Sequence, residues 1–332
     1  MERTFSRNLS IFVPEKPTIG ITLGDPAGIG SEILVKALPE VHQRCRPVLY
    51  GSEWSLRDGS SIAGVDLDAL NISTFIDVKI PKPSDFTFGQ VSAACGEVAV
   101  RAVETAAEDV ISGKLDALMT CPLNKEAIHA AGYREIGHQE IFARLSNAKS
   151  TATMLMTTGL RVVHLSTHLS IIEAARSITS EIVLERLRLI RDCFEEWGLS
   201  PVRIGVAALN PHGGEGGLLG REEIERIRPA VEQAVQEGIK AMGPFPADSI
   251  FNRAIAGEFD VVLAMYHDQG HIAIKVHDFH QSISATLGLP FVRTSVDHGT
   301  AFDIAGRGIA NHRSTIAAID AAITLVTGTL GC

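Results

Sequence analysis

The sequence predicts an α/β fold around a mostly parallel sheet, and three observations lead to that prediction. Strand-like and helix-like segments alternate along the whole chain, which is the pattern of strand–helix–strand units. Aromatic residues make up only 5% of the 332 residues, whereas there are 30 glycines, a composition that suits close packing and tight turns. No proline-, glycine- or serine-rich linker divides the chain, so we expect any two lobes to be interleaved.

Each predicted element rests on residue periodicity. Strands are short apolar runs, and helices are longer segments whose apolar residues recur every three or four positions. The predicted strands cover residues 18–24, 115–120, 151–158, 160–167, 202–210, 260–266, 273–276 and 290–296. The predicted helices cover residues 30–40, 97–112, 180–198, 222–238 (which must bend or begin near Pro229) and 314–328. The strands on either side of Gly159 should pair through a turn and add some antiparallel character.

Composition argues against several classes of protein. The net charge of −9 and the pI of about 5.7 argue against a general nucleic-acid binder, although a few local cations can still bind a small anion. Residues 1–16 lack an apolar signal core, and no segment reaches the ~18 apolar residues of a membrane span. We expect a loose N-terminal extension, no membrane contact and a cytoplasmic location. The five cysteines, which include no CxxC pair, should be reduced thiols.

The segment "GDPAGIGSE" (Gly24 to Glu32) follows the first strand and opens a helix. Its glycines do not have the GxGxxG spacing of a dinucleotide fingerprint, and it lacks the Lys-Ser/Thr of a P-loop. Two interpretations remain open. The segment is either a tight strand-to-helix turn or an anion site made by free backbone N–H groups.

Three predicted strands are each followed by a histidine: His168, His212 and His267. Adjacent parallel strands deliver their carboxyl ends to one edge of a sheet, and three imidazoles leave an open position on a catalytic metal ion. In "HLSTH" the strand spacing separates His164 from His168 by roughly 13 Å, so we interpret His164 as structural. The stretch "AMYHDQGHIAIK" around His267 is therefore either a polar turn or the edge of a metal site.

Four sequence blocks resemble the 4-hydroxythreonine-4-phosphate dehydrogenase (PdxA) family. They are "LNPHGGEGG", "AMYHDQG", "STHL" and "TLGLPFVRTSVDHGTAFDIAGRG", and the resemblance extends over nearly the whole chain. It implies the two-lobed fold of isocitrate and isopropylmalate dehydrogenases in a homodimer that shares its active sites. The first lobe would comprise residues 17–128 and 295–332 with the cofactor segment. The second, residues 129–294, would carry the metal and substrate residues and the dimer interface.

The resemblance also implies roles for individual residues. The metal ligands would be His168, His212 and His267, with one contributed by the partner subunit. The substrate contacts would be His138, Gln139, Lys275, Ser284 and Arg293. Two of these depart from the family's pattern, because Gln139 stands where threonine is usual and Ser284 where asparagine is usual. In addition, "TCPLNKEAIHAAG" resembles catabolic relatives that act on 4-phospho-threonate or 4-phospho-erythronate.

The family reaction oxidises a secondary alcohol β to a carboxylate, with a hydride passing to NAD or NADP, and the β-keto acid then loses CO2. Zn2+ suits imidazole ligands, with Co2+, Mn2+ or Mg2+ as alternatives. Lys275 and Arg293 would hold a substrate phosphate. Asp248, Asp268 and Lys275 are candidate catalytic groups, although both aspartates could instead serve a turn or a helix cap. The cofactor contacts would be His298, Gly299, Thr300 and Asp303.

The expected substrate is therefore 4-phosphohydroxy-L-threonine, which would place the enzyme in pyridoxine biosynthesis. The alternative is the same chemistry on 4-phospho-D-threonate, 4-phospho-D-erythronate or a cyclic diol acid. Phosphate acyltransferases share the broad fold, but they need no metal, so the histidines argue against them. A non-catalytic metal- or metabolite-binding protein would need neither Lys275 and Arg293 beside a metal nor a nucleotide segment.

Overall fold

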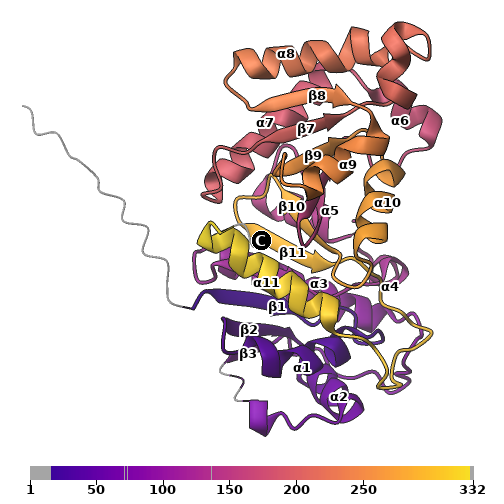
Figure 1. The fold of residues 1–332 in the computed structure, drawn as a ribbon. Helices are drawn as coiled ribbons and strands as arrows, with labels where there is room; N and C mark the ends of the chain where they lie inside the picture. The colour runs from indigo at the N-terminus through magenta and orange to yellow at the C-terminus, as the bar shows by residue number, and fades with distance from the viewer. Residues whose placement is uncertain (1–15, 71, 73, 136, 330–332) are drawn as a thin grey trace, which may run out of the picture.

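A computed structural model describes residues 16–70, 72, 74–135 and 137–329 (Figure 1). The predicted N-terminal extension, apart from Lys16, and Cys332 lie outside the described residues. Within them, the strands form one sheet of eleven strands that runs through the whole molecule from β3 to β8, in the order β3-β2-β1-β4-β11-β10-β5-β6-β9-β7-β8. The strands are β1 (Thr18–Thr22), β2 (Arg46–Gly51), β3 (Thr74–Asp77), β4 (Ala117–Thr120), β5 (Ala152–Thr157), β6 (Leu160–His164), β7 (Ile204–Ala207), β8 (Ala241–Phe245), β9 (Val261–Ala264), β10 (Ile283–Leu287) and β11 (Val292–Val296).

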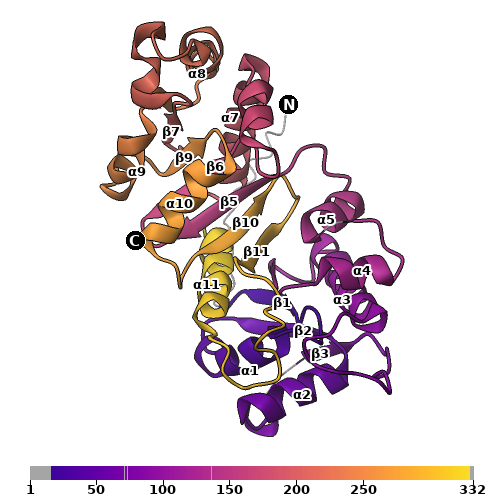
Figure 2. The same cartoon turned by 90° about the vertical axis from the view of Figure 1, so that its right-hand side faces the viewer.

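Helices connect and cover these strands (Figures 1 and 2). They are α1 (Gly30–Val41), α2 (Glu53–Ala63), α3 (Ala93–Ile111), α4 (Lys125–Ala130), α5 (His138–Ser146), α6 (Ile171–Ser177), α7 (Ser180–Glu196), α8 (Arg228–Gln236), α9 (Ala247–Ile255), α10 (His267–His277) and α11 (Arg313–Thr327). Shorter helical turns are η1 (Asp68–Leu70), η2 (Pro211–Gly217) and η3 (Glu223–Ile227). No helix in the described ranges is long and apolar enough to cross a membrane.

The predicted α/β fold class is confirmed, and most of the sheet is parallel. Strands β3, β2, β1, β4 and β11 form one parallel group, and strands β6, β9, β7 and β8 form a second. Strands β10 and β5 lie between the groups and are antiparallel to both of their neighbours. The two groups therefore run in opposite directions. The predicted boundary between lobes, at residues 294 and 295, falls inside β11, and the division into lobes stays a prediction.

This arrangement decides where the strand ends lie. The carboxyl ends of β1, β4 and β11 meet at one edge of the sheet, whereas those of β6, β9 and β7 meet at the opposite edge. Helix α10 starts after β9 at the second edge and leads to β10, which starts at the first edge, and it packs against β5, β6 and β9 on the way (Figure 2). It therefore connects the two edges.

Two local predictions have clear outcomes. The strand predicted at residues 273–276 is wrong, because these residues belong to α10. Alternating β-branched residues suggested a half-buried strand, but only Ile274 of this run is buried and Val276 is 81% exposed. The prediction that this helix bends or begins near Pro229 is confirmed in its second form: residues 223–227 form a turn of π-helix, and α8 begins at Arg228 with Pro229 in its first turn, where the missing N–H costs nothing.

Candidate active site

The antiparallel strands β10 and β11 present one polar face. Ser284 lies opposite Ser295 in the register, and Thr294, which points the other way, donates its hydroxyl to a carbonyl of α11. Because side chains alternate along a strand, residues two apart share a face. The polar face away from α11 therefore carries Ser282, Ser284 and Thr286 from one strand and Arg293, Ser295 and Asp297 from the other, counting the residues that flank the strands.

Arg293 is a buried cation without a carboxylate partner. Its side chain is 7% exposed and donates hydrogen bonds to the hydroxyls of Thr286 (3.1 Å) and Thr120 (2.6 Å), while its buried Nε has no partner in the described residues. Burial is the only cause that shifts the pKa of Arg293, which falls to about 9. A buried charge that only neutral groups contact is costly unless an anion binds there. Arg293 is therefore the strongest anion-binding candidate on this face.

His138 and Gln139 lie at the start of α5, beside this arginine. His138 is half-buried, its Nε2 has no partner among the described residues, and burial together with the charge of Arg293 lowers its pKa well below the usual value. A neutral imidazole remains, with one nitrogen free to donate or accept. The Gln139 amide is occupied: its nitrogen donates to Thr151 (2.7 Å), and its oxygen accepts from Thr153 (3.2 Å).

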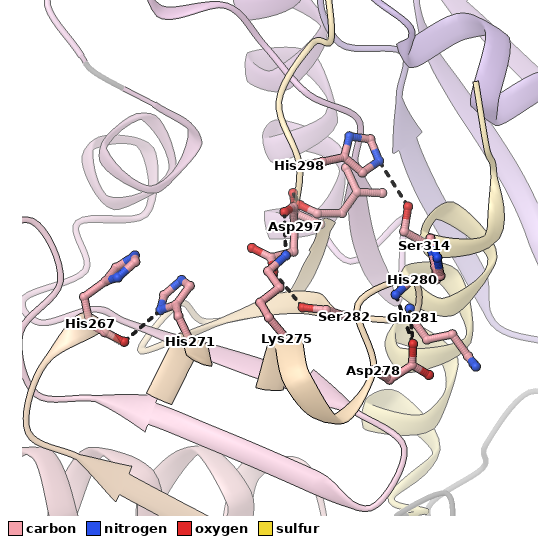
Figure 3. Close-up of polar contacts among 12 residues, drawn as sticks. His267, His271, Lys275, Asp278, His280, Gln281, Ser282, Asp297, His298 and Ser314 are labelled. Carbon is pink, nitrogen blue, oxygen red and sulfur yellow. Dashed lines mark hydrogen bonds and ion pairs between the residues drawn. The ribbon is translucent and has the colours of Figure 1, made fainter. Parts of the chain in front are cut away.

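Lys275 reaches the same face from α10, close to the carboxyl end of β11 (Figure 3). Its Nζ lies 2.5 Å from Oδ2 of Asp297 and donates to the backbone oxygen of the same residue at 3.3 Å. Ser282 donates its hydroxyl to that Oδ2 at 2.6 Å. The pair borders a cavity of about 310 Å³. The cavity is lined by Lys275, Ser282, Asp297, His298, Gly299 and Asn311, among others.

The predicted cofactor segment lies partly in this cavity. His298 and Gly299 line it, and the His298 ring contacts Ser314 of α11 at 3.1 Å. Thr300 is buried against the segment from Gly24 to Glu32. Its carbonyl accepts the N–H of Ile29, and a Cβ on Gly28 would approach its side chain to 2.9 Å. Asp303 is exposed.

The first glycine of "GDPAGIGSE" is explained by its turn. Gly24 has φ +74°, and a Cβ there would lie 2.2 Å from the Pro122 carbonyl oxygen. The glycine spacing is thus accounted for by close packing.

The three strand-end histidines come from the second edge of the sheet. The predicted neighbourhood of their strands is confirmed, since β6, β9 and β7 are adjacent and parallel. His168 and His267 line one cavity of about 430 Å³, and His212 lies outside it. Within one chain, the described residues contain no group of three His, Cys, Asp or Glu side chains arranged to hold a metal ion.

Two of these histidines have a carboxylate on Nδ1. His267 Nδ1 lies 2.6 Å from Asp268 Oδ1, and His212 Nδ1 lies 2.9 Å from Glu215 Oε1. A carboxylate in this position favours the proton on Nδ1 and leaves the Nε2 lone pair available, as in metal-binding histidines. The donor set therefore fits a divalent metal ion.

Asp268, Asp248 and His164 have different surroundings in the structure. Asp268 contacts a predicted ligand, whereas Asp248 is an exposed residue in the first turn of α9. His164 is structural, as expected: it is buried in β6, its Nε2 lies 3.2 Å from Nδ1 of His271, and His271 stacks on the His267 ring.

Sequence reasoning missed Asp297, Ser282, Thr120 and Thr286. The alternation of polar residues in "SISAT" and "RTSVD" was the signal that could have revealed the polar face.

Comparison with known proteins gives the class of this chain. It is 41% identical to the D-threonate 4-phosphate dehydrogenase of Cupriavidus necator, over 94% of this chain and 98% of the relative. A crystal structure of a 4-hydroxythreonine-4-phosphate dehydrogenase from Burkholderia phymatum superimposes with a TM-score of 0.83 at 41% identity, covering 94% and 99% of the two chains. The corresponding Klebsiella pneumoniae structure gives a TM-score of 0.86 at 35% identity, covering 94% and 98%. The chain is thus a dehydrogenase of the α/β class.

A family model described as "Pyridoxal phosphate biosynthetic protein PdxA" matches residues 43–322. The chain belongs to the PdxA family.

Proposed function

We propose that this protein is a metal-dependent NAD(P)+ oxidoreductase that oxidises the secondary alcohol of a phosphorylated β-hydroxy acid. The product is a β-keto acid, which loses CO2. The observation that carries the proposal is Arg293, because a buried guanidinium without a carboxylate partner suits a phosphate group. His138 would add a hydrogen bond from its free Nε2.

The preferred substrate in this proposal is D-threonate 4-phosphate, and 4-phosphohydroxy-L-threonine is the second candidate. The two compounds differ at the carbon next to the carboxylate, which carries a hydroxyl in the first and an amine in the second. Two substrate contacts of this chain depart from the family's usual residues: the Gln139 amide is engaged with two threonines, and Ser284 offers one short hydroxyl. The relative named for D-threonate 4-phosphate favours the first compound. Turnover of the second would place the enzyme in pyridoxine biosynthesis.

The proposed cofactor site is the cavity beside His298 and Gly299, with Thr300 and Asp303 in the following turn. The nicotinamide cofactor, when bound, takes up the hydrogen and the two electrons removed from the substrate carbon. Lys275 stands at the border of this cavity and of the polar face. We assign it to the reacting end of the substrate, where its ammonium group donates a hydrogen bond or a proton to an oxygen.

The proposed metal ligands are His168, His212 and His267, with one supplied by a second copy of the chain. A divalent metal, when bound, supplies positive charge that lowers the pKa of a substrate hydroxyl. Asp268 and Glu215 orient two of the imidazoles. Zn2+ is the metal that suits imidazole best, and Co2+, Mn2+ and Mg2+ are alternatives. Asp248 is retained as a candidate catalytic carboxylate.

A homodimer would complete this site. Large exposed apolar side chains sit on the elements next to the three histidines: Leu169, Ile171 and Ile172 beside His168, Leu218 and Leu219 beside His212, and Ile272 and Val276 on α10. An apolar surface of this kind marks a protein interface. The four buried free cysteines of the described residues support a reducing, cytoplasmic location.

To test the proposal, NADH and NADPH formation by the purified protein is measured with D-threonate 4-phosphate or 4-phosphohydroxy-L-threonine. Each reaction is run with and without a chelator. We expect turnover of the first compound, lost with the chelator and restored by Zn2+ or Co2+. Turnover of the second compound alone would replace the preferred substrate, and turnover of neither would overturn the phosphate assignment.

A further inference from the structure

Lys275 and Arg293 differ in how their charges are balanced. The carboxylate of Asp297 lies against the Lys275 ammonium group, whereas in the described residues the Arg293 guanidinium contacts two hydroxyl groups and the Phe142 ring. A phosphate dianion therefore gains more at Arg293, because the charge of Lys275 is already largely compensated. The value of Lys275 to the reaction then lies in the direction of its N–H bonds rather than in its charge.

Asp297 fixes that direction. An ammonium group has three N–H bonds in tetrahedral geometry. Asp297 accepts one of them at its backbone oxygen, and its Oδ2 forms an ion pair with the same ammonium group at 2.5 Å. Both contacts lie on the Asp297 side of the group, so at least one N–H bond points away from Asp297. Figure 3 shows Lys275 between α10 and the end of β11, with Asp297 on one side of the ammonium group.

Ser282 holds the carboxylate in turn. Its hydroxyl donates to the same Oδ2 at 2.6 Å, and both residues are mostly buried at the end of the paired strands. The centroid of the Phe279 ring lies 5.1 Å from the Lys275 Nζ. The carboxylate of Asp278, by contrast, accepts the backbone N–H groups of His280 and Gln281.

We propose that Asp297, held by Ser282, is a positioning residue that aims one N–H of Lys275 at the reacting oxygen of the substrate. This role rests on the proposed function, which assigns Lys275 to the reaction. Helix α10 carries His267, His271 and Lys275 at four-residue intervals, hence along one face. Asp297 therefore orients the lysine near one end of α10, and the other end of α10 carries the proposed metal ligand His267.

The first test measures steady-state kinetics of Asp297→Asn, Ser282→Ala and the matched control Asp278→Asn, with whichever phosphorylated substrate the wild type oxidises. We expect Asp297→Asn to lower kcat about 10- to 100-fold with less than a threefold change in KM. Ser282→Ala should lower kcat two- to fivefold, and the control should stay within twofold of wild type. A rise in KM with unchanged kcat would overturn the proposal.

A double-mutant cycle separates positioning from a merely structural effect. In the Lys275→Met background, Asp297→Asn should change the residual kcat by less than twofold, because the group that it positions is absent. An equal loss in both backgrounds would show that Asp297 acts independently of Lys275 and would overturn the proposal.

Competitive acylation, followed by mass spectrometry of the lysine-containing peptides, tests the pairing without any substrate. Asp297→Asn should raise the labelling of Lys275 at least fivefold relative to the exposed Lys240, and Asp278→Asn should leave the ratio unchanged. An unchanged ratio in Asp297→Asn would overturn the pairing. If the wild type oxidises neither substrate, the proposed function fails, and this ratio still decides the Asp297–Lys275 contact.

Discussion

Lys275 and Arg293 lie on one polar face, and the groups around each of them determine which role it can have. Both Lys275 and Arg293 could be read from the sequence as phosphate contacts. The structure adds that Lys275 is paired with Asp297, whereas Arg293 is buried without a carboxylate. That distinction depends on the pairing of β10 with β11 and on the course of α10. Sequence periodicity contains neither contact, so Asp297 could not be predicted.

Replacement of Arg293 should weaken substrate binding and raise the stability of the folded protein. Arg293→Met removes the proposed phosphate anchor, so KM for the phosphorylated substrate should rise about 30-fold or more, equivalent to about 2 kcal/mol. The same change removes an uncompensated buried charge, so the thermal midpoint should rise by about 2–4 °C. Arg203→Met, which breaks an exposed ion pair with Asp260, is the control and should leave KM unchanged. An unaltered KM in Arg293→Met would place the phosphate elsewhere.

His164 should make the folded protein sensitive to acid. Burial lowers the pKa of His164 to about 3 in the folded state, whereas an unfolded histidine has a pKa of about 6.5. The unfolded chain therefore binds more protons below pH 6.5, and stability falls as the pH falls, by about 2 kcal/mol between pH 7 and pH 5 for this group. Denaturant unfolding with chelator present should show a shallower pH dependence in His164→Gln. An identical dependence in the variant would contradict this origin.

At the scale of single elements, local patterns predicted the ends of strands better than the second half of α10. The histidines after β6, β7 and β9 were found because apolar strands are easily recognised and their polar ends stand out. Helix α10 was missed at residues 273–276 because its outer face carries Ile272 and Val276. Those residues are apolar although they are exposed, and periodicity alone cannot separate an exposed apolar face from one that is buried in the core.

The η2 loop offers a test of how an element holds a proposed ligand. His212 has φ +55° and Glu215 φ +45° within a left-handed turn, a conformation that costs energy for non-glycine residues. Glu223, which is 1% exposed, accepts the backbone N–H groups of Leu209 and Asn210 at 2.9 and 2.7 Å. Its carboxylate therefore holds the chain just before the strained turn.

Loss of that carboxylate should loosen the turn and weaken metal binding. Glu223→Ala leaves two N–H groups without their acceptor and should lower Zn2+ affinity about 10- to 100-fold, measured by competition with a chromophoric chelator. Glu223→Gln keeps one acceptor oxygen and should show a smaller effect. The exposed Glu232→Ala on α8 is the control. Wild-type affinity in Glu223→Ala would show that His212 does not depend on this support.

At the scale of the whole molecule, the fold class followed from the sequence, but the arrangement of the sheet did not. Alternating strands and helices predict parallel groups wherever they occur. The sequence pattern does not show that two such groups run in opposite directions, or that β10 and β5 join them. Pairings between distant segments such as β4 and β11 are decided by packing over the whole chain, to which local periodicity is insensitive.

This arrangement leaves large apolar side chains exposed on α10 and after η2, which leads to a prediction about assembly. Val276, on the helix that begins with the proposed ligand His267, is 81% exposed, and Leu218, directly after the turn that carries His212, is 87% exposed. Val276→Asp would place a charge in the proposed interface, so light scattering should show a monomer where the wild type is a dimer. Zn2+ affinity should fall at the same time, because the partner's ligand is lost. Val91→Asp, at an exposed apolar position in the loop between β3 and α3, should stay dimeric with wild-type affinity. A monomeric wild type that binds Zn2+ at full strength would show that one chain supplies the whole site.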